Sequence, residues 1–179
     1  MNRSRSKAVF LDRDGTLMWD PGFCSDPCQV ELLPGIPAAL ARLQSAGFKL
    51  IIVTNQSGIG RGFFTEAEFW MVQDRLQELL KPVEIAAVYF CPDHPDRATN
   101  CRKPGPGMLL QAAENLDIDL SASFMVGDKE SDVQAGVHAG VQAAIRVDPS
   151  ADGLAKIGRN VWVVPDLEAA ADVILRLGD

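Results

Sequence analysis

Two aspartates, Asp12 and Asp14, follow the short apolar run Ala8–Leu11 directly, and Gly15 comes next. A carboxylate at such a position can attack phosphorus, while a second one nearby protonates the leaving oxygen and later activates water. Taken alone, this short motif is equally typical of a surface turn or a calcium-binding loop. Residues 17–19 supply none of the further oxygen ligands that an EF-hand requires, which argues against calcium.

A second polar cluster follows the apolar run Leu50–Val53. It consists of small hydrogen-bond donors suited to the nonbridging oxygens of a phosphoryl group, namely Thr54, Asn55, Gln56, Ser57 and Gly58. The same residue types dominate ordinary turns, so this cluster gains meaning only beside the other motifs.

Two basic residues, Arg102 and Lys103, precede a proline- and glycine-rich turn and a helical pattern. The lysine could neutralise phosphoryl charge, and the arginine could bind phosphate or sugar oxygens with two nitrogens. Asp128 follows the apolar run Phe124–Val126 and is the expected third ligand of a magnesium ion. We expect Asp132 to orient this loop or to cap the helix after it.

The elements that must position these residues alternate along the chain. Apolar runs typical of buried parallel strands occur at 8–11, 50–53, 86–90, 124–126, 143–147 and 161–164. Helical spacing occurs at 36–46, 66–80, 107–116, 131–139 and 167–177, with Thr65 as an N-cap and Gly47 as a C-cap. We therefore predict an α/β fold: a doubly wound, mostly parallel sheet with helices on both faces. Ligands bind such sheets at the carboxyl ends of the strands.

Length and composition favour one domain spanning residues 1–179. The formal charge of −7 and the absence of a long basic run make nucleic acid an unexpected partner. The polar segment Met1–Lys7 leads into an apolar run too short for a signal or a membrane span, so we expect a cytoplasmic protein. We also expect it to be a monomer. Cys24, Cys28, Cys91 and Cys101 would then be reduced thiols, and the first two receive no assigned role.

The four motifs, in this order at successive strand ends, resemble those of the haloacid dehalogenase (HAD) superfamily of phosphotransferases. The resemblance implies that Asp12 is the nucleophile and Asp14 the general acid and base. It also implies that Asp12, the backbone carbonyl of Asp14 and Asp128 hold Mg²⁺, and that Thr54 and Lys103 bind the phosphoryl group.

Within the superfamily, the segments Phe10–Leu17, Val53–Gly62, Cys101–Pro104 and Met125–Lys129 look like those of D-glycero-D-manno-heptose-1,7-bisphosphate 7-phosphatases. That family lacks a large cap domain, and the resemblance implies release of a sugar 7-phosphate through an aspartyl-phosphate. The stretch Asn55–Arg61, including Arg61 itself, and Arg102 would contact the sugar and its distal phosphate. Histidinol phosphate is the alternative substrate. A non-enzymatic, receiver-like phospho-acceptor is an alternative of another class, against which Asp14 argues.

Members of this family often carry a zinc loop that reads Cys-x-His and then Cys-x-Cys before Arg-Lys-Pro. The corresponding positions here are Cys91, Asp93, Thr99 and Cys101, so two of the four ligands are replaced. A tetrahedral site could still recruit Cys91, His94, Cys101 and a carboxylate. We do not favour zinc, because the ligand set is incomplete.

Overall fold

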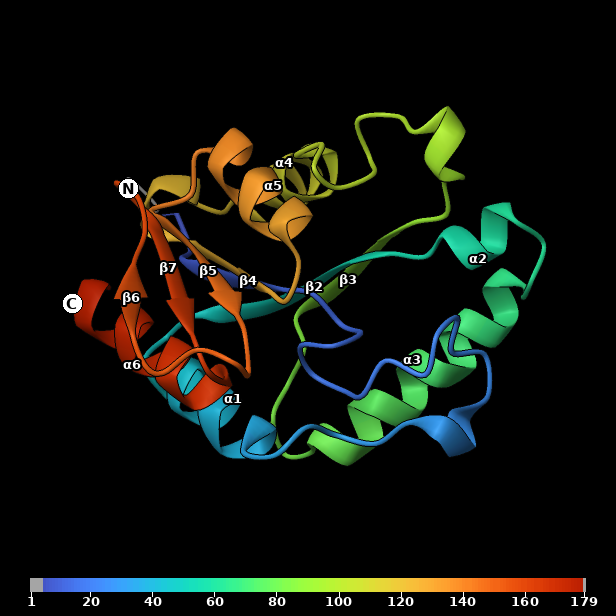
Figure 1. The fold of residues 1–179 in the computed structure, drawn as a ribbon, viewed down its shortest axis with the longest axis horizontal. Coiled ribbons are helices and arrows are strands. Elements are labelled where there is room, and N and C mark those ends of the chain that lie inside the picture. Colours follow the sequence, from blue (N-terminus) through green and yellow to red (C-terminus); the bar gives the residue numbers. More distant parts are fainter. Residues whose placement is uncertain (1–4, 179) are drawn as a thin grey trace.

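The computed structural model describes residues 5–178, and Figure 1 shows their arrangement. The first four residues of the segment Met1–Lys7, on which the expectation about a signal depends, lie outside this range. That residues 1–179 form one domain stays a prediction.

A seven-stranded sheet forms the centre of the molecule, in the order β3-β2-β1-β4-β5-β7-β6. Its strands are β1 (Ala8–Leu11), β2 (Lys49–Asn55), β3 (Ala87–Cys91), β4 (Phe124–Gly127), β5 (Ala143–Val147), β6 (Ala155–Lys156) and β7 (Val161–Val164). All pairs are parallel except β6 with β7. The predicted doubly wound sheet is confirmed. The two-residue strand β6 was not predicted, because it is too short to show a period.

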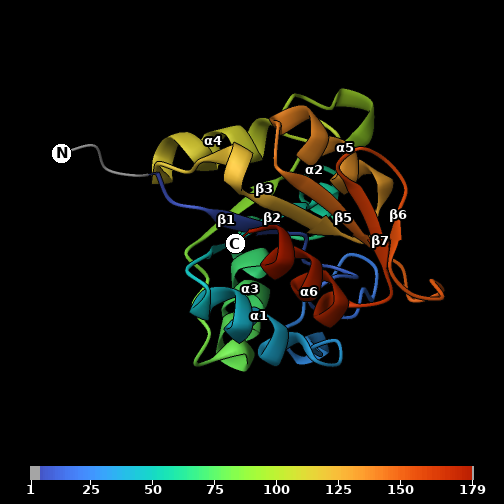
Figure 2. The same ribbon diagram turned by 90° about the vertical axis from the view of Figure 1, so that its left-hand side faces the viewer.

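Helices cover both faces of the sheet, as Figure 2 shows: α4 and α5 lie on one side and α1, α3 and α6 on the other. Their bounds are α1 (Ile36–Ser45), α2 (Ser57–Gly60), α3 (Glu66–Leu80), α4 (Gly107–Leu116), α5 (Glu130–Ala139) and α6 (Leu167–Leu177). The predicted helices are confirmed to within a residue at either end, and the four-residue α2 is additional. Short 3₁₀ turns at Pro27–Gln29, Pro95–Arg97 and Leu120–Ala122 complete the chain.

Alternation along the strands divides the core into two layers. In β1, Val9 and Leu11 pack with one layer, and Ala8 and Phe10 with the other. All four side chains are fully buried, as expected of a central strand with helices on both faces. Because Leu11 is the last residue of β1, the chain leaves the sheet at Asp12.

Local signals in the sequence fix the helix ends. Thr65 is the N-cap of α3: its hydroxyl accepts a hydrogen bond from the N–H of Glu68, and the Glu68 carboxylate accepts one from the N–H of Thr65. Gly47 follows α1 with a φ of +85°, a conformation that glycine adopts at little cost. Within residues 5–178 no large cap domain is inserted, and no helix has the length and apolar character needed to cross a membrane.

Candidate active site

The carboxyl ends of three neighbouring strands bring the main candidate residues together. Asp12 follows β1, Thr54 lies at the end of β2, and Asp128 follows β4, and these strands are adjacent in the sheet. The N–H of Asp12 donates to the carbonyl of Val126 at 2.9 Å, which ties the exit from β1 to β4. Positions more than a hundred residues apart therefore face one small region.

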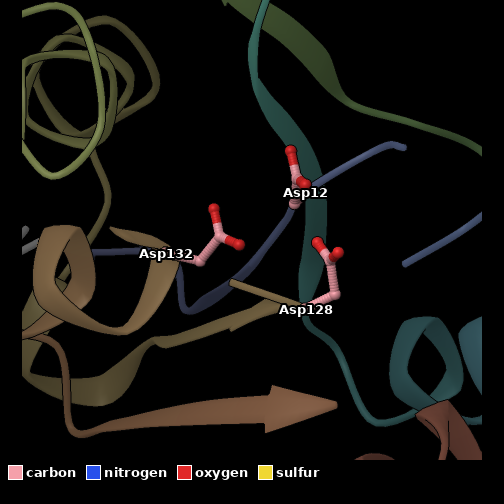
Figure 3. A group of neighbouring side chains, drawn as sticks. All are labelled: Asp12, Asp128 and Asp132. Carbon is pink, nitrogen blue, oxygen red and sulfur yellow. The ribbon is translucent and has the colours of Figure 1, made fainter. Parts of the chain in front are cut away.

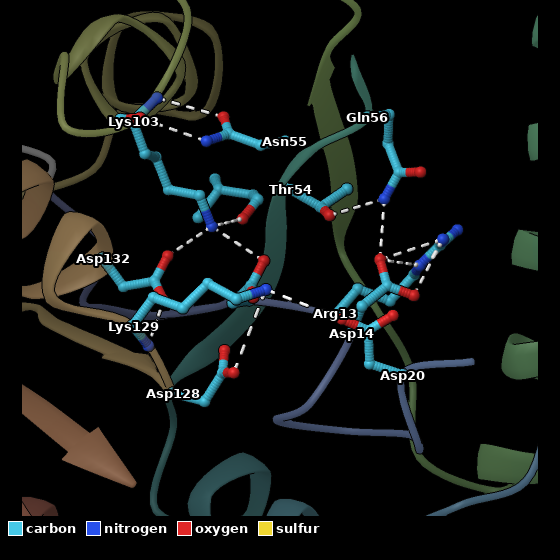
Figure 4. Close-up of polar contacts among 12 residues, drawn as sticks. Arg13, Asp14, Asp20, Thr54, Asn55, Gln56, Lys103, Asp128, Lys129 and Asp132 are labelled. Carbon is cyan, nitrogen blue, oxygen red and sulfur yellow. Dashed lines mark hydrogen bonds and ion pairs between the residues drawn. The ribbon is translucent and has the colours of Figure 1, made fainter. Parts of the chain in front are cut away.

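Lys103 lies at the centre of this region and is almost fully buried. Its Nζ is 2.7 Å from Asp12 Oδ1 and 2.6 Å from Asp132 Oδ1, and it donates to the carbonyl of Val53 at 2.8 Å (Figure 4). Burial alone would lower the pKa of Lys103, but the charges of Asp12 and Asp132 outweigh it and raise the pKa above its usual value. The lysine is therefore charged at neutral pH.

Three carboxylates converge beside this lysine. Oxygen atoms of Asp12, Asp128 and Asp132 all lie within 4.8 Å of one another, and Figure 3 shows them around a shared space. Oδ1 of Asp128 is buried and has no hydrogen-bond partner among the described residues. A buried carboxylate oxygen without a donor is costly unless a cation binds it, so this donor set fits a hard divalent ion such as Mg²⁺.

The environment of Asp128 supports that fit. Burial and the nearby charge of Asp12 raise the pKa of Asp128 to about 6. Gly15 has a φ of +84°, and a Cβ added there would lie 2.6 Å from Asp128 Oδ2. Glycine at this position therefore lets the turn after β1 pass directly against the carboxylate.

Asp132 also has a structural task. Its Oδ2 accepts a hydrogen bond of 2.9 Å from the N–H of Lys129 at the start of α5, so the predicted capping role is confirmed. Its ion pair with Lys103 was not predicted from the sequence. Oδ1 of Asp132 pairs with the ammonium group of Lys103, and Oδ2 binds the backbone N–H of Lys129. Asp132 therefore links α5 to the loop that carries Lys103.

Asp14 lies outside the three-carboxylate group, and its side chain is held by protein donors. The guanidinium of Arg13 donates to both oxygens of Asp14 at 3.0 and 3.1 Å, and Gln56 Nε2 donates to Oδ2 at 2.8 Å. Arg13 is fully buried and lies over the ring of Phe69. The role of Arg13 was not predicted from the sequence, although an arginine between two aspartates could have suggested a side-chain partner for one of them. That the carbonyl of Asp14 binds metal stays a prediction.

Asn55 and Gln56, expected to bind substrate, make hydrogen bonds within the protein. Asn55 Nδ2 donates to the carbonyl of Lys103 at 3.1 Å, and the N–H of Lys103 donates to Asn55 Oδ1 at 3.0 Å. Gln56 Nε2 also donates to Thr54 Oγ1 at 2.8 Å. Both amides therefore position residues that face the site: Lys103, Thr54 and Asp14 (Figure 4).

Comparison with known proteins gives a consistent result. Residues 100–170 match the Hydrolase-like family model, described as HAD-hydrolase-like. The D-glycero-beta-D-manno-heptose-1,7-bisphosphate 7-phosphatase of Escherichia coli K12 is 40% identical over 183 residues, covering 94% of this chain and 87% of that protein. The Yersinia pestis enzyme of the same name is 41% identical over 177 residues, covering 94% and 89%. The chain belongs to this phosphatase family.

A solved structure of a heptose bisphosphate phosphatase has the same fold. The D,D-heptose 1,7-bisphosphate phosphatase of B. bronchiseptica, complexed with magnesium and phosphate, matches with a TM-score of 0.83 and 33% identity, covering 95% of this chain and 98% of that one. Membership of a phosphatase family also argues against the receiver-like alternative.

In this member of the heptose phosphatase family, a cavity of about 560 Å³ opens beside the carboxylates. Most of the residues that line it have charged or hydrogen-bonding side chains, and they come from four segments of the chain: Asp14, Asp20, Gly22, Phe23, Cys24, Asn55, Gln56, Ser57, Arg102, Lys103, Pro104, Lys129 and Ser131. Ser57 and Arg102 thus lie where the sequence analysis expected substrate contacts. Arg61 is exposed at the C-terminal end of α2 and lies outside this lining.

Lys129 is a further cavity residue that the sequence analysis did not single out. Its Nζ is 3.7 Å from Asp20 Oδ2 and 3.9 Å from Asp128 Oδ2. Burial opposes the charge of Lys129, but Asp128 and Asp12 raise its pKa. The lysine therefore links the loop after β1 to the loop after β4, and it adds positive charge to the cavity.

The loop from Cys91 to Cys101, compared above with a zinc loop, is closed by other contacts. Asp93 Oδ2 accepts hydrogen bonds of 2.7 Å from both the N–H and the hydroxyl of Thr99. Contact with Cys101 and burial raise the pKa of the Cys91 thiol. Within residues 5–178, Cys91, His94 and Cys101 do not form a group of converging ligand atoms like that of the three aspartates.

Proposed function

We propose that this protein hydrolyses the 7-phosphate of D-glycero-D-manno-heptose 1,7-bisphosphate through an aspartyl-phosphate on Asp12. The observation that carries the proposal is the convergence of Asp12, Asp128 and Lys103 near adjacent strand ends. Asp14, two residues after Asp12, is held beside them by Gln56. Family membership supports the choice of substrate, because the relatives in E. coli and Y. pestis are named for that reaction.

In the first step, a carboxylate oxygen of Asp12 attacks phosphorus, and the bond from phosphorus to the sugar oxygen breaks. Asp14, in its protonated form, donates that proton to the departing oxygen and becomes a carboxylate. Arg13 and Gln56 hold the Asp14 carboxyl group in place for this transfer. Lys103 stabilises the negative charge on the transferring group. Bound Mg²⁺, held by Asp12 and Asp128, would supply further positive charge at the phosphoryl oxygens.

In the second step, Asp14 removes a proton from a water molecule, which attacks the phosphorus of the aspartyl-phosphate. Inorganic phosphate leaves, and the Asp12 carboxylate is restored. Two displacements at phosphorus thus replace one difficult attack by water. The buried contacts of Lys103 keep its ammonium group oriented through both steps.

A phosphate-release assay tests this function. The substrates are the heptose 1,7-bisphosphate, the heptose 1-phosphate and histidinol phosphate, each with Mg²⁺ and with EDTA. We expect one equivalent of phosphate from the bisphosphate, little from the 1-phosphate, and no turnover in EDTA. A higher kcat/KM for histidinol phosphate would refute the substrate, and full activity in EDTA would refute the metal.

We propose further that the enzyme acts as a cytoplasmic monomer without nucleic acid. The formal charge of −7 argues against nucleic acid as a partner. The four unpaired cysteines fit a reducing compartment such as the cytoplasm. Light scattering at micromolar concentration tests the oligomeric state, and a mass twice that of the chain would contradict it.

A further inference from the structure

Phe23 has an unusual backbone conformation at the mouth of the cavity. Its φ is +54°, in the left-handed region that bulky side chains avoid. Both neighbours hold the segment in place: the N–H of Gly22 donates to Asp20 Oδ1 at 2.9 Å, and Cys24 is buried. Backbone strain of this kind often accompanies a functional site.

The phenyl ring of Phe23 is also held in place by residues in and just after α2. It contacts Phe63 edge to face, with 4.9 Å between ring centroids. It also packs on Gly58 in α2, where an added Cβ would lie 2.9 Å from Phe23 Cδ1. Both rings are about half exposed, at 49% for Phe23 and 61% for Phe63. The contact therefore joins the loop after β1 to the end of α2 without removing either ring from solvent.

Most of the other residues in the cavity lining carry charges or hydrogen-bonding groups, such as Asp14, Arg102 and Lys129. Such groups suit phosphate and hydroxyl oxygens, but they do not suit the C–H surfaces of a carbon skeleton. Phe23 is the aromatic residue in this lining. An aromatic ring at the mouth offers the apolar surface that these C–H groups require.

We propose that Phe23, held in place by Phe63, is a specificity-determining residue that packs against the carbon skeleton of the leaving group. The inference rests on the proposed function only in requiring a sugar-sized leaving group. It explains why a strained phenylalanine occupies a position that glycine or asparagine would adopt more easily. Substrates without a carbon skeleton of this size would gain nothing from the ring.

The test compares Phe23→Asn with Phe23→Tyr. Asparagine tolerates positive φ and removes the ring, whereas tyrosine keeps the ring. For each protein, kcat/KM is measured with the heptose bisphosphate and with acetyl phosphate, and the melting temperature is recorded. Losing the burial of roughly 50 Å² of C–H surface corresponds to about a tenfold loss in affinity.

We therefore expect Phe23→Asn to lower the ratio of the two kcat/KM values about tenfold, without lowering the melting temperature. Phe23→Tyr should keep the ratio within about twofold. Ile157→Asn, which changes an exposed apolar residue outside the cavity lining, is the matched control and should leave the ratio unchanged.

An unchanged ratio in Phe23→Asn, or equal losses on both substrates, would overturn the proposal. A lower melting temperature with an unchanged ratio would show that the ring is only structural. If the wild-type protein does not hydrolyse the heptose bisphosphate, the proposed function fails by itself. The same ratio is then measured with the sugar phosphate that the wild-type protein hydrolyses fastest, so Phe23 is still tested.

Discussion

Replacing Lys103 with methionine should strongly destabilise the metal-free protein. Methionine keeps most of the side-chain volume and removes only the charge and the hydrogen bonds. The side chains of Lys103 and Asp132 are each 1% exposed, and that of Asp12 is 6% exposed. In the variant, two buried carboxylates would lose the ammonium group that lies between them. Desolvated carboxylates without a counter-charge are among the costliest groups in a protein interior.

The expected loss can be estimated from the burial. Removing one partner of a buried ion pair costs about 3–5 kcal/mol in the free energy of unfolding. For a chain of this length, each kcal/mol lowers the melting temperature by about 2–4 °C, which gives roughly 6–20 °C. Lys129→Met is the matched control, because the Lys129 side chain is 57% exposed and its ion pairs are long. Its loss should stay below about 1 kcal/mol.

Urea denaturation in EDTA at pH 7.5 and at pH 5 measures both variants. Burial and the charge of Asp12 raise the pKa of Asp132, so its folded-state affinity for a proton exceeds that of the unfolded chain. Such a carboxyl group stabilises the fold as pH falls, so the deficit of Lys103→Met should shrink at pH 5. Equal stability of Lys103→Met and Lys129→Met at pH 7.5 would refute the reasoning.

Three further outcomes follow from the site geometry. Asp12→Asn should abolish phosphate release while the circular dichroism spectrum stays native, and normal turnover would exclude Asp12 as the nucleophile. Gly15→Ala should weaken Mg²⁺ binding in calorimetry at least tenfold, because the added Cβ would meet the Asp128 carboxylate and φ is +84°. In EDTA, the wild-type protein should gain stability relative to Asp128→Asn as pH falls from 7 to 4, by about 2 kcal/mol in urea denaturation. The sign follows because the pKa of Asp128 is about 6 when folded and 3.8 when unfolded. A difference that does not change with pH would contradict that shift.

The sequence located site residues where a polar residue stands at the end of an apolar run. Each apolar run had to be a buried strand, and parallel strands place their carboxyl ends at one edge of the sheet. Asp12, Thr54 and Asp128 each lie at the end of such a run, so their proximity could be predicted from the order of motifs alone. The strand order β2-β1-β4 confirms this prediction.

The hydrogen-bond partners of the polar residues could not be predicted in the same way. Asn55 and Gln56 have side chains that suit a phosphoryl group and a protein partner equally well. Only the tertiary structure shows that Asn55 binds the backbone of Lys103 and that Gln56 binds Asp14. The ion pair of Lys103 with Asp132 joins the loop before α4 to the first turn of α5, and no local pattern in the sequence encodes that contact.

The charges at the site link metal binding to phosphate binding. Asp12, Asp128 and Asp132 bring three carboxyl groups into one space, where the buried cation Lys103 pairs with Asp12 and Asp132. With the carboxylates ionised, the group carries an excess of negative charge, and burial together with the charge of Asp12 raises the pKa of Asp128. A phosphate dianion entering this group would meet repulsion that Lys103 alone does not cancel. A divalent cation reverses that balance, so each ligand should increase the affinity for the other by the same factor. The crowded carboxylates therefore favour phosphate binding only when the cation is bound.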